Sequence, residues 1–456
     1  MKKVFLALMA VAAIALTGCK ESNDEPQPQP QPQDGVIQIT HQLGERVKNP
    51  LNQQWCKDSV SAKATLSSLR RISDRLYYMD FVTDLNLQKL VEAKLRTNKA
   101  VCDMMNESWF NPDGYEEPFD EENPDQTPAC SGFICFNEAG ELLFGRNFDG
   151  AGGPMCMVFN TANGTHDYVQ LTAPNYNSKL YNGPANELPN GDGILSDDTT
   201  SLHRLLRQPV ATMDGMNEYG LCFGAFQLPV FRADNDTNYR HGPRRVMQDS
   251  GKNVINSSLM HNLILSECKT VKDVEKYMRG LDFAATHPSL NVHWMVADAT
   301  GDYAVFEYWE DSLYVLRAKN RNDIVHWTSH VVPYEYNSIE NYYCNPYATA
   351  TYLIDKWQNM YSSKVRVNHL MMSYRPVMDE MEALRCLQAG SFGVEMLGDV
   401  TNWSCVYNPK QRTILFCMRN DMSKIYKVDL KKELKEPGDY GTPQPPKPQG
   451  RDTIPY

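Results

Sequence analysis

The most regular hydrophobic pattern of the chain is a set of short apolar runs that occur in pairs, each pair separated by a turn. Four such pairs stand out: CSGFICF-NEAG-ELLFGRN (130–147), MDGM-NEYG-LCFGAF (213–226), HWMVA-DATG-DYAVFEYW (293–309) and WSCVY-NPKQ-RTILFCM (403–418). Apolar runs on both sides of a turn rich in Asn, Asp and Gly are typical of β-hairpins. The sequence therefore predicts antiparallel sheet in this part of the chain.

Other segments carry apolar residues at spacings of three and four, which indicates amphipathic helices. The spacing predicts helix over residues 58–108, 254–279 and 378–388, and Thr270 with Asp273 can form a capping box inside the second segment. Hairpins mixed with amphipathic helices favour a layered α+β fold.

The first residues have the pattern of a secretory signal, with two lysines, an apolar run from Val4 to Leu16 and small residues before Cys19. These small residues resemble a bacterial lipobox, in which the cysteine is lipidated. We therefore expect an exported bacterial lipoprotein that is anchored at Cys19, at the periplasmic or surface face of the outer membrane. An ordinary cleaved signal is the alternative.

The remaining sequence divides by composition. A Pro/Gln-rich linker follows the signal, the helical segment ends in an acidic aperiodic loop, and the end of the chain is again rich in proline. The expected organisation is signal peptide (1–18), lipidated cysteine and linker (19–35), helical prosegment or small subunit (36–129), hairpin-rich domain (130–435) and tail (436–456).

The net charge and the motifs limit the classes of partner and cofactor that the protein can have. The net charge of −11 argues against a nucleic-acid partner. The twelve cysteines include no CxxC pair, so most are expected to be buried thiols. His326 and His330 lack the glutamate of a zinc motif, and residues 190–198 lack the ligand order of a calcium loop. We therefore expect no metal and no cofactor.

The first hairpin places a cysteine at its open end. If residues 137–140 form the turn, Phe136 pairs with Glu141, and Cys130 lies opposite Asn147. A bulge would shift this register by one residue and change the face on which each side chain lies.

In either register, Arg146 and Asp149 lie within a residue or two of the Cys130 thiol. A guanidinium beside a thiol favours the thiolate and lowers its pKa. A carboxylate would repel that thiolate, but it could hold an ammonium group.

Cleavage between Ala129 and Cys130 would supply that ammonium. The new α-amine would have a pKa of roughly 7.7–8.0 and could accept the proton of the thiol as a general base. The acidic loop before Cys130 is a site where cleavage is sterically easy.

The motifs C-S-G-F … L-L-F-G-R-N-F-D, M-D-G-M-N-E-Y-G-L, H-W-M-V-A-D-A-T-G-D-Y-A-V-F-E-Y and W-S-C-V-Y-N occur in this order over 130–430. Together they resemble the linear amide C–N hydrolases, the choloylglycine hydrolase-like family of bile salt hydrolases, penicillin V acylases, acid ceramidase and penicillin acyltransferase. The resemblance implies the αββα four-layer sandwich of N-terminal nucleophile hydrolases, with Cys130 exposed by autoproteolysis. The helical segment before it would be a prosegment or small subunit, as in the ceramidase-like branch.

By the same resemblance, Cys130 is the nucleophile, its α-amine is the base, Arg146 supports the thiolate and Asp149 orients the amine. The chain departs from the family at three places. Gln227 stands where bile salt hydrolases have an oxyanion-hole Asn, Ser329 follows Trp-Thr where many members have Thr-Asn, and Tyr347 lies near the position of a second arginine. Gln227 and Ser329 are retained as candidate catalytic residues.

We therefore expect a membrane-anchored, self-cleaving cysteine amidohydrolase. Its partner would be an N-acylated small molecule, such as a bile salt, an N-acyl amino acid, a lipid amide or a penicillin V-like compound. Two alternatives remain, acyl transfer from the same thioester and a surface lipoprotein that binds a ligand without catalysis. Simpler interpretations are a buried structural Cys130, a surface ion pair of Arg146 with Asp149, a polar strand residue at Gln227 and a solvent-facing Ser329.

Overall fold

The protein was analysed as a computed structural model. The structure describes residues 35–47, 60–95, 100, 104, 130–150, 154–173, 209, 212–228, 250–284, 291–309, 312–317, 338–340, 377–391 and 400–434. From Ile37 onward these residues belong to one compact unit.

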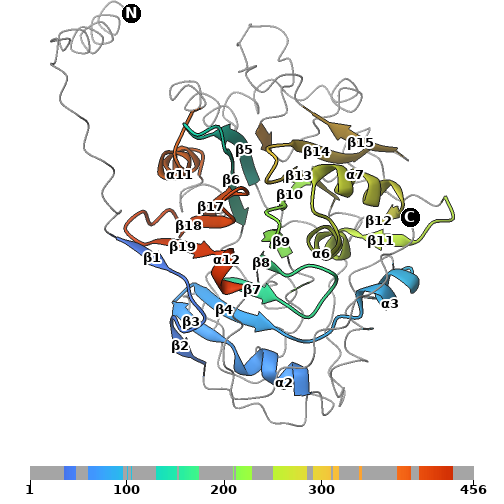
Figure 1. Cartoon of the computed structure of the whole chain (residues 1–456), viewed down its shortest axis with the longest axis horizontal. Helices are drawn as coiled ribbons and strands as arrows, with labels where there is room; N and C mark the ends of the chain where they lie inside the picture. Colours follow the sequence, from blue (N-terminus) through green and yellow to red (C-terminus); the bar gives the residue numbers. More distant parts are fainter. Residues whose placement is uncertain are drawn as a thin grey trace, which may run out of the picture. The chain divides into compact units, whose positions relative to one another are not determined.

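Two large sheets dominate this unit (Figure 1). The first, sheet A, has the order β1 (Val36–Gln38), β19 (Ile425–Asp429), β18 (Thr413–Met418), β17 (Val400–Asn408), β6 (Leu142–Gly150), β5 (Cys130–Phe136) and β16 (Ser338–Glu340). Sheet B has the order β15 (Ser312–Leu316), β14 (Tyr303–Trp309), β13 (Asn291–Ala297), β10 (Cys222–Leu228), β9 (Thr212–Asn217), β8 (Tyr168–Thr172), β7 (Met155–Asn160), β4 (Leu76–Phe81), β3 (Arg70–Ser73) and β2 (Glu45–Arg46). Two further strands, β11 (Val254–Asn256) and β12 (Asp282–Ala284), form a small parallel pair.

The two sheets share one apolar layer. Side chains from both sheets meet in it, among them Phe144, Phe148, Met157, Phe226, Met295, Trp403 and Tyr407. The opposite face of sheet B packs in a second apolar layer against α6 (Ser257–Glu267) and α7 (Val271–Arg279). Helix α11 (Glu380–Ala389) contacts β6, β17 and β18 of sheet A. The order of layers is helix, sheet, sheet, helix, so the α+β sandwich expected from the sequence is confirmed.

Three of the predicted hairpins close with the same turn. Gly140, Gly220 and Gly301 have positive φ angles of 73°, 84° and 82°, and each donates its N–H to the carbonyl of the residue three positions earlier. A glycine in this left-handed conformation after a tight turn adds one residue to the loop and produces a bulge. In the first hairpin Asn137 N–H donates to the carbonyl of Glu141, and Phe136 pairs with Leu142 rather than Glu141. The predicted register is therefore wrong by one residue.

The prediction of helix over 58–108 is wrong for the two strands β3 and β4. Helices α2 (Val60–Ser67) and α3 (Leu87–Glu92) lie in this segment, and β3 and β4 lie between them. All six residues of β4 are buried, because the strand lies between β3 and β7 inside sheet B. A run that is apolar on both faces loses the two-residue period that identifies a strand.

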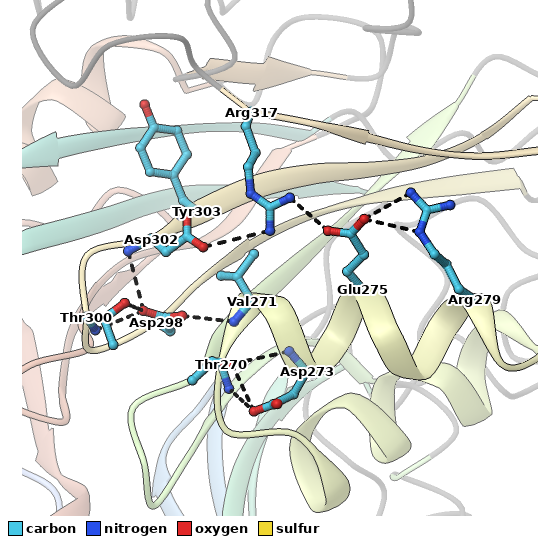
Figure 2. Close-up of polar contacts among 10 residues, drawn as sticks. All are labelled: Thr270, Val271, Asp273, Glu275, Arg279, Asp298, Thr300, Asp302, Tyr303 and Arg317. Atoms are coloured by element: carbon cyan, nitrogen blue, oxygen red, sulfur yellow. Dashed lines mark hydrogen bonds and ion pairs between the residues drawn. The ribbon is translucent and has the colours of Figure 1, made fainter. Parts of the chain in front are cut away.

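Helix α7 is fixed to sheet B by polar contacts that Figure 2 shows. The predicted capping box of Thr270 and Asp273 is present at its first turn. The Val271 N–H donates to Asp298 Oδ2 at 2.9 Å, and Asp298 Oδ1 accepts from the backbone and hydroxyl of Thr300 in the turn between β13 and β14. Farther along the helix, Glu275 accepts from Arg279 and from Arg317.

The eight cysteines among the described residues are all buried, and none of these eight forms a disulfide. Within the described part of the chain, no helix is both long enough and apolar enough to cross a membrane. The predicted signal peptide, Cys19, the linker and the Pro-rich tail lie outside the described residues.

Candidate active site

Cys130 is the first residue of β5, and only 4% of it is exposed. It pairs with Phe148 instead of the expected Asn147, and Gly132 pairs with Arg146. Residues that pair directly across two strands lie on the same face, and so do residues two positions apart. The one-residue shift therefore places Cys130 and Arg146 diagonally on the same face of sheet A, the face that meets sheet B.

Arg146 is fully buried beside the thiol, with Nη2 3.8 Å from Cys130 Sγ. The same nitrogen donates to the carbonyl of Ala225 at 2.7 Å. The guanidinium lies over the rings of Phe148 and Phe226, 5.1 and 5.2 Å from their centroids. These contacts come from both sheets, so the position of the charge depends on the packing of one sheet on the other.

Asp214 of β9 is the ionic partner of Arg146, and its Oδ2 lies 2.9 Å from Arg146 Nε. Its carboxylate also accepts from Trp403 Nε1 at 3.2 Å and from Tyr407 Oη at 3.0 Å. Burial raises the pKa of Asp214, while Arg146 and the two hydrogen bonds lower it. Asp214 was not predicted as a site residue from the sequence; the available signal was one acidic residue inside the apolar MDGM strand.

The pKa of the Cys130 thiol is higher than the neighbouring Arg146 guanidinium alone would make it. Burial raises its pKa to about 11, against the effect of Arg146, which lowers it. The negative charges of Asp149 and Asp214 raise it further, and a hydrogen bond with the backbone of Asp149 lowers it. Because the effect of burial outweighs that of Arg146, the intact chain holds Cys130 as a neutral thiol near pH 7.

Asp149 lies at the end of β6, one residue beyond the position opposite Cys130, and it is fully buried. It pairs with Thr401 of β17, whose hydroxyl donates to Asp149 Oδ1. A register shift in β17 between Thr401 and Trp403 lies beside it. The structure therefore places all three residues of the predicted Cys-Arg-Asp set on β5 and β6, with Asp149 next to the start of the cysteine strand.

Gly224 of β10 leaves room for Arg146 between the sheets. A Cβ at this position would lie 2.9 Å from Arg146 Cδ and Nε and 3.0 Å from Phe144 Cζ. Contacts of 2.9 Å are shorter than real Cβ atoms make. The glycine in LCFGAF is therefore required by the close approach of the guanidinium.

A second buried ionisable pair, His293 and Glu307, lies on neighbouring strands of sheet B. Its Nδ1 and Oε2 atoms are 3.0 Å apart, and neither side chain is exposed. His293 meets the edge of the Phe226 ring, whose face contacts Arg146. The sequence analysis did not single out this pair, although both residues lie in the third hairpin.

The side chains of the other expected site residues lie outside the described residues. The backbone of Gln227 lies in β10 and pairs with Val292, and its side chain is outside the described residues. Ala129, Ser329 and Tyr347 are also outside them, as are His326, His330 and residues 190–198.

Asn217, which the sequence placed at a hairpin turn, is confirmed there. Its side chain donates to the carbonyls of Leu265 and Cys268 and accepts from the N–H groups of Tyr219 and Leu221. It joins the turn to the end of α6.

Among the described residues, no group of three His, Cys, Asp or Glu side chains could hold a metal ion.

Part of the chain matches the model of a known protein family. A family model described as linear amide C-N hydrolases, choloylglycine hydrolase family, matches residues 130–342, and the match begins at Cys130. Two variants of the conjugated bile acid hydrolase of Clostridium perfringens are similar in structure, with 14% and 13% identity and TM-scores of 0.42 and 0.44, covering 67% of this chain and 93% of theirs. Penicillin V acylase from Agrobacterium tumefaciens has 13% identity and a TM-score of 0.41, covering 66% of this chain and 87% of its own. The comparison with curated proteins finds no match. Residues 130–342 are thus similar to the linear amide C–N hydrolases of the choloylglycine hydrolase family.

Proposed function

We propose that the protein is a self-cleaving cysteine amidohydrolase in which Cys130 is the nucleophile. The observation that carries this proposal is the position of Arg146 Nη2, 3.8 Å from Cys130 Sγ in a fully buried layer between the two sheets. The family match, which begins at this cysteine, supports the reaction class.

Maturation begins at the peptide bond between Ala129 and Cys130. Cys130 Sγ attacks the carbonyl carbon of Ala129, the C–N bond breaks, and the nitrogen takes the proton that the thiol loses. Water then hydrolyses the resulting thioester and leaves a carboxylate on Ala129 and a free α-amine and thiol on Cys130. Each bond that breaks is replaced by one that forms, so only water is consumed.

The new α-amine is the general base of the mature enzyme. A thiol with a pKa of about 11 needs a base at neutral pH, and Arg146 is already paired with Asp214. The amine accepts the thiol proton as sulfur attacks the substrate carbonyl. The resulting α-ammonium then protonates the leaving amine, and water hydrolyses the thioester. Asp149, beside the start of β5, holds the α-ammonium in place.

Arg146 holds the developing thiolate, and backbone N–H groups with Gln227 hold the oxyanion. Ser329 is retained as a further polar group at the substrate. The substrate is an N-acylated small molecule with an apolar acyl group, because apolar side chains surround the thiol in the layer between the sheets. Bile salts, N-acyl amino acids, lipid amides and penicillin V-like compounds have this chemistry. The enzyme is anchored to the outer membrane through a lipid on Cys19.

Two measurements test the proposal. Denatured mass and N-terminal sequencing should find a chain that starts at Cys130 in the wild type and an uncut chain in Cys130→Ala. Release of free amine from a panel of N-acyl amides should require the cut wild-type chain. A wild-type chain that stays uncut after prolonged incubation would contradict self-cleavage, and binding of the amides without turnover would favour the ligand-binding alternative. Products formed with added amines would reveal acyl transfer.

A further inference from the structure

We infer that the segment before Cys130 is not discarded after cleavage but stays as a second chain whose strands complete both sheets. The inference deepens the proposed function and rests on its cut at Cys130. It concerns the surface between the N-terminal part, represented by β1 to β4 with α2 and α3, and the part that begins at Cys130.

The strongest contact is the pairing of β4 with β7 inside sheet B. Six residue pairs join them in parallel, from Leu76 with Met155 to Phe81 with Asn160. Both strands are buried over their whole length. Because β7 also pairs with β8, loss of β4 would turn an interior strand of the catalytic part into an unprotected edge.

The side chains of β4 belong to both apolar layers. Leu76 and Tyr78 pack in the layer between the sheets, which also contains Cys130. Tyr77, Met79 and Phe81 pack on the opposite face of sheet B. Departure of this strand would therefore expose apolar surface in both layers at once, which water disfavours.

Polar contacts fix the segment that follows β4. Asn163, which comes shortly after β7, donates to the carbonyl of Thr83 at 2.9 Å and accepts from the N–H of Leu85. Asn163 and Thr83 are both buried, so separation would break hydrogen bonds that are shielded from water.

The same N-terminal part also reaches sheet A. Strand β1 lies at its edge beside β19, and the Ile39 N–H donates to the carbonyl of Lys427 at 2.8 Å. The His41 N–H donates to Glu433 Oε2 at 3.0 Å, and the His41 ring lies 3.3 Å from the same oxygen. The helix that carries Glu433, α12 (Leu430–Glu433), is the last described element, so the N-terminal part holds the catalytic part at both sheets.

The cut also changes how the catalytic chain is attached to the membrane. If the lipid is on Cys19, the cut removes the covalent link between the anchor and the catalytic chain. The catalytic chain is then retained at the membrane only by strand pairing and burial against the N-terminal chain.

The test uses the full chain with a C-terminal affinity tag, extracted in mild detergent. After self-cleavage, both fragments should be captured on the tag in a 1:1 ratio and should remain together in about 1 M NaCl, because salt screens exposed charges and leaves apolar packing intact. A catalytic fragment that is captured alone and stays folded by circular dichroism would overturn the inference.

A second sample separates this result from self-cleavage itself. A Cys130→Ala chain with a recognition sequence for a site-specific protease inserted within residues 111–125 can be cut by added protease. Its fragments should also stay together. If the wild type remains uncut, the proposed function fails, while the protease-cut chain still decides whether the two parts hold each other.

A matched pair of variants tests the contact at sheet A. Glu433→Gln weakens a contact between the two parts, whereas Glu380→Gln alters a carboxylate whose partners Asn408, Thr413 and Lys427 lie in the catalytic part. In urea below the unfolding midpoint, Glu433→Gln should release the N-terminal fragment about tenfold faster than wild type, since the His41 N–H then donates to a neutral amide and the ionic contact with the His41 ring is lost. Equal release rates for the two variants would show that Glu433 does not help to hold the two parts together.

Discussion

Arg146 Nε and Asp214 Oδ2 are 2.9 Å apart, and both side chains are fully buried. Arg146 lies on β6 of sheet A and Asp214 on β9 of sheet B, so this ion pair joins the two sheets directly beside the Cys130 thiol. Trp403 and Tyr407 of sheet A hold the carboxylate from the other side. The pair therefore couples the packing of the sheets to the position of the charge that acts on the thiol.

Asp214→Asn should impair both stability and activity. The change leaves the Arg146 guanidinium without its buried counter-ion, and breaking such a pair costs about 3–5 kcal/mol. We expect a lower urea midpoint and at least about a tenfold loss of amide hydrolysis in the molecules that remain folded. Urea titration and kcat for an N-acyl amide measure the two effects.

Asp302→Asn is the control for this variant. Asp302 pairs with Arg317 at 3.7 Å, but both side chains are about one-third exposed. Its removal should change stability by less than about 1 kcal/mol. Equal effects of the two changes would show that burial gives the Asp214 pair no special role.

The rate of self-cleavage should rise with pH. Burial raises the pKa of the Cys130 thiol to about 11, so below that pH the thiolate fraction grows about tenfold for each pH unit. Hydrolysis by the mature enzyme should instead level off near pH 8, roughly the pKa of an α-amine. Gel time courses of freshly refolded chain between pH 6 and pH 9 test the first expectation, and a rate that does not change with pH would contradict it.

His41 should make the fold more stable at pH 6 than at pH 8. Burial lowers the pKa of His41, but Asp80 and Glu433 raise it by more, so the net shift is upward from 6.5. The pKa of Glu433 is also raised, chiefly by burial. Both groups bind protons more tightly in the folded state, so their contribution is lost as pH rises through the folded pKa values.

His41→Asn should therefore reduce the difference between the urea midpoints at pH 6 and pH 8. His166→Asn is a matched comparison, because burial lowers the pKa of His166 and its contribution is lost as pH falls. The two variants should change the pH dependence in opposite directions. A shift of the same sign in both would contradict the assignment.

Asp298→Ala should destabilise the domain without changing the chemistry. The carboxylate caps α7 at Val271 and holds Thr300 in the neighbouring turn (Figure 2), so its loss leaves several N–H groups without their partner. A lost helix cap typically costs about 0.5–2 kcal/mol. The thermal midpoint should fall while kcat per folded molecule stays at the wild-type value; an unchanged midpoint would contradict the capping role.

The hairpins and the α+β class followed from the sequence because each turn carries its own local signal. The register of the first hairpin was predicted wrongly, although the sequence contained the signal for it. Gly140 follows Asn137 by three residues, and a glycine that adopts positive φ there makes the loop one residue longer. That single residue decides whether Arg146 faces Cys130 or the opposite side of the sheet.

The strand β4 was misassigned for a different reason. LYYMDF is buried on both faces, so its apolar residues follow no two-residue period, and neighbouring helical spacings gave the segment a helical appearance. Its partner β7 lies more than 70 residues later, and no local pattern predicts such a pairing.

The candidate site was predictable where its residues belong to one hairpin. Cys130, Arg146 and Asp149 lie on β5 and β6, so strand geometry brings them together. Asp214 comes from one motif and Trp403 and Tyr407 from another that is distant in sequence, and only the packing of two sheets places them around the guanidinium.

The parallel pairing of β4 with β7 also orders events in time. While the chain is continuous, residues 82–154 tether the two strands, and the tether gives them a high effective concentration for each other. A cut before the strands have paired would turn this closure into an encounter between separate molecules. The peptide bond before Cys130 must therefore outlast the assembly of sheet B, because an earlier cut would separate the protein into two unfinished halves.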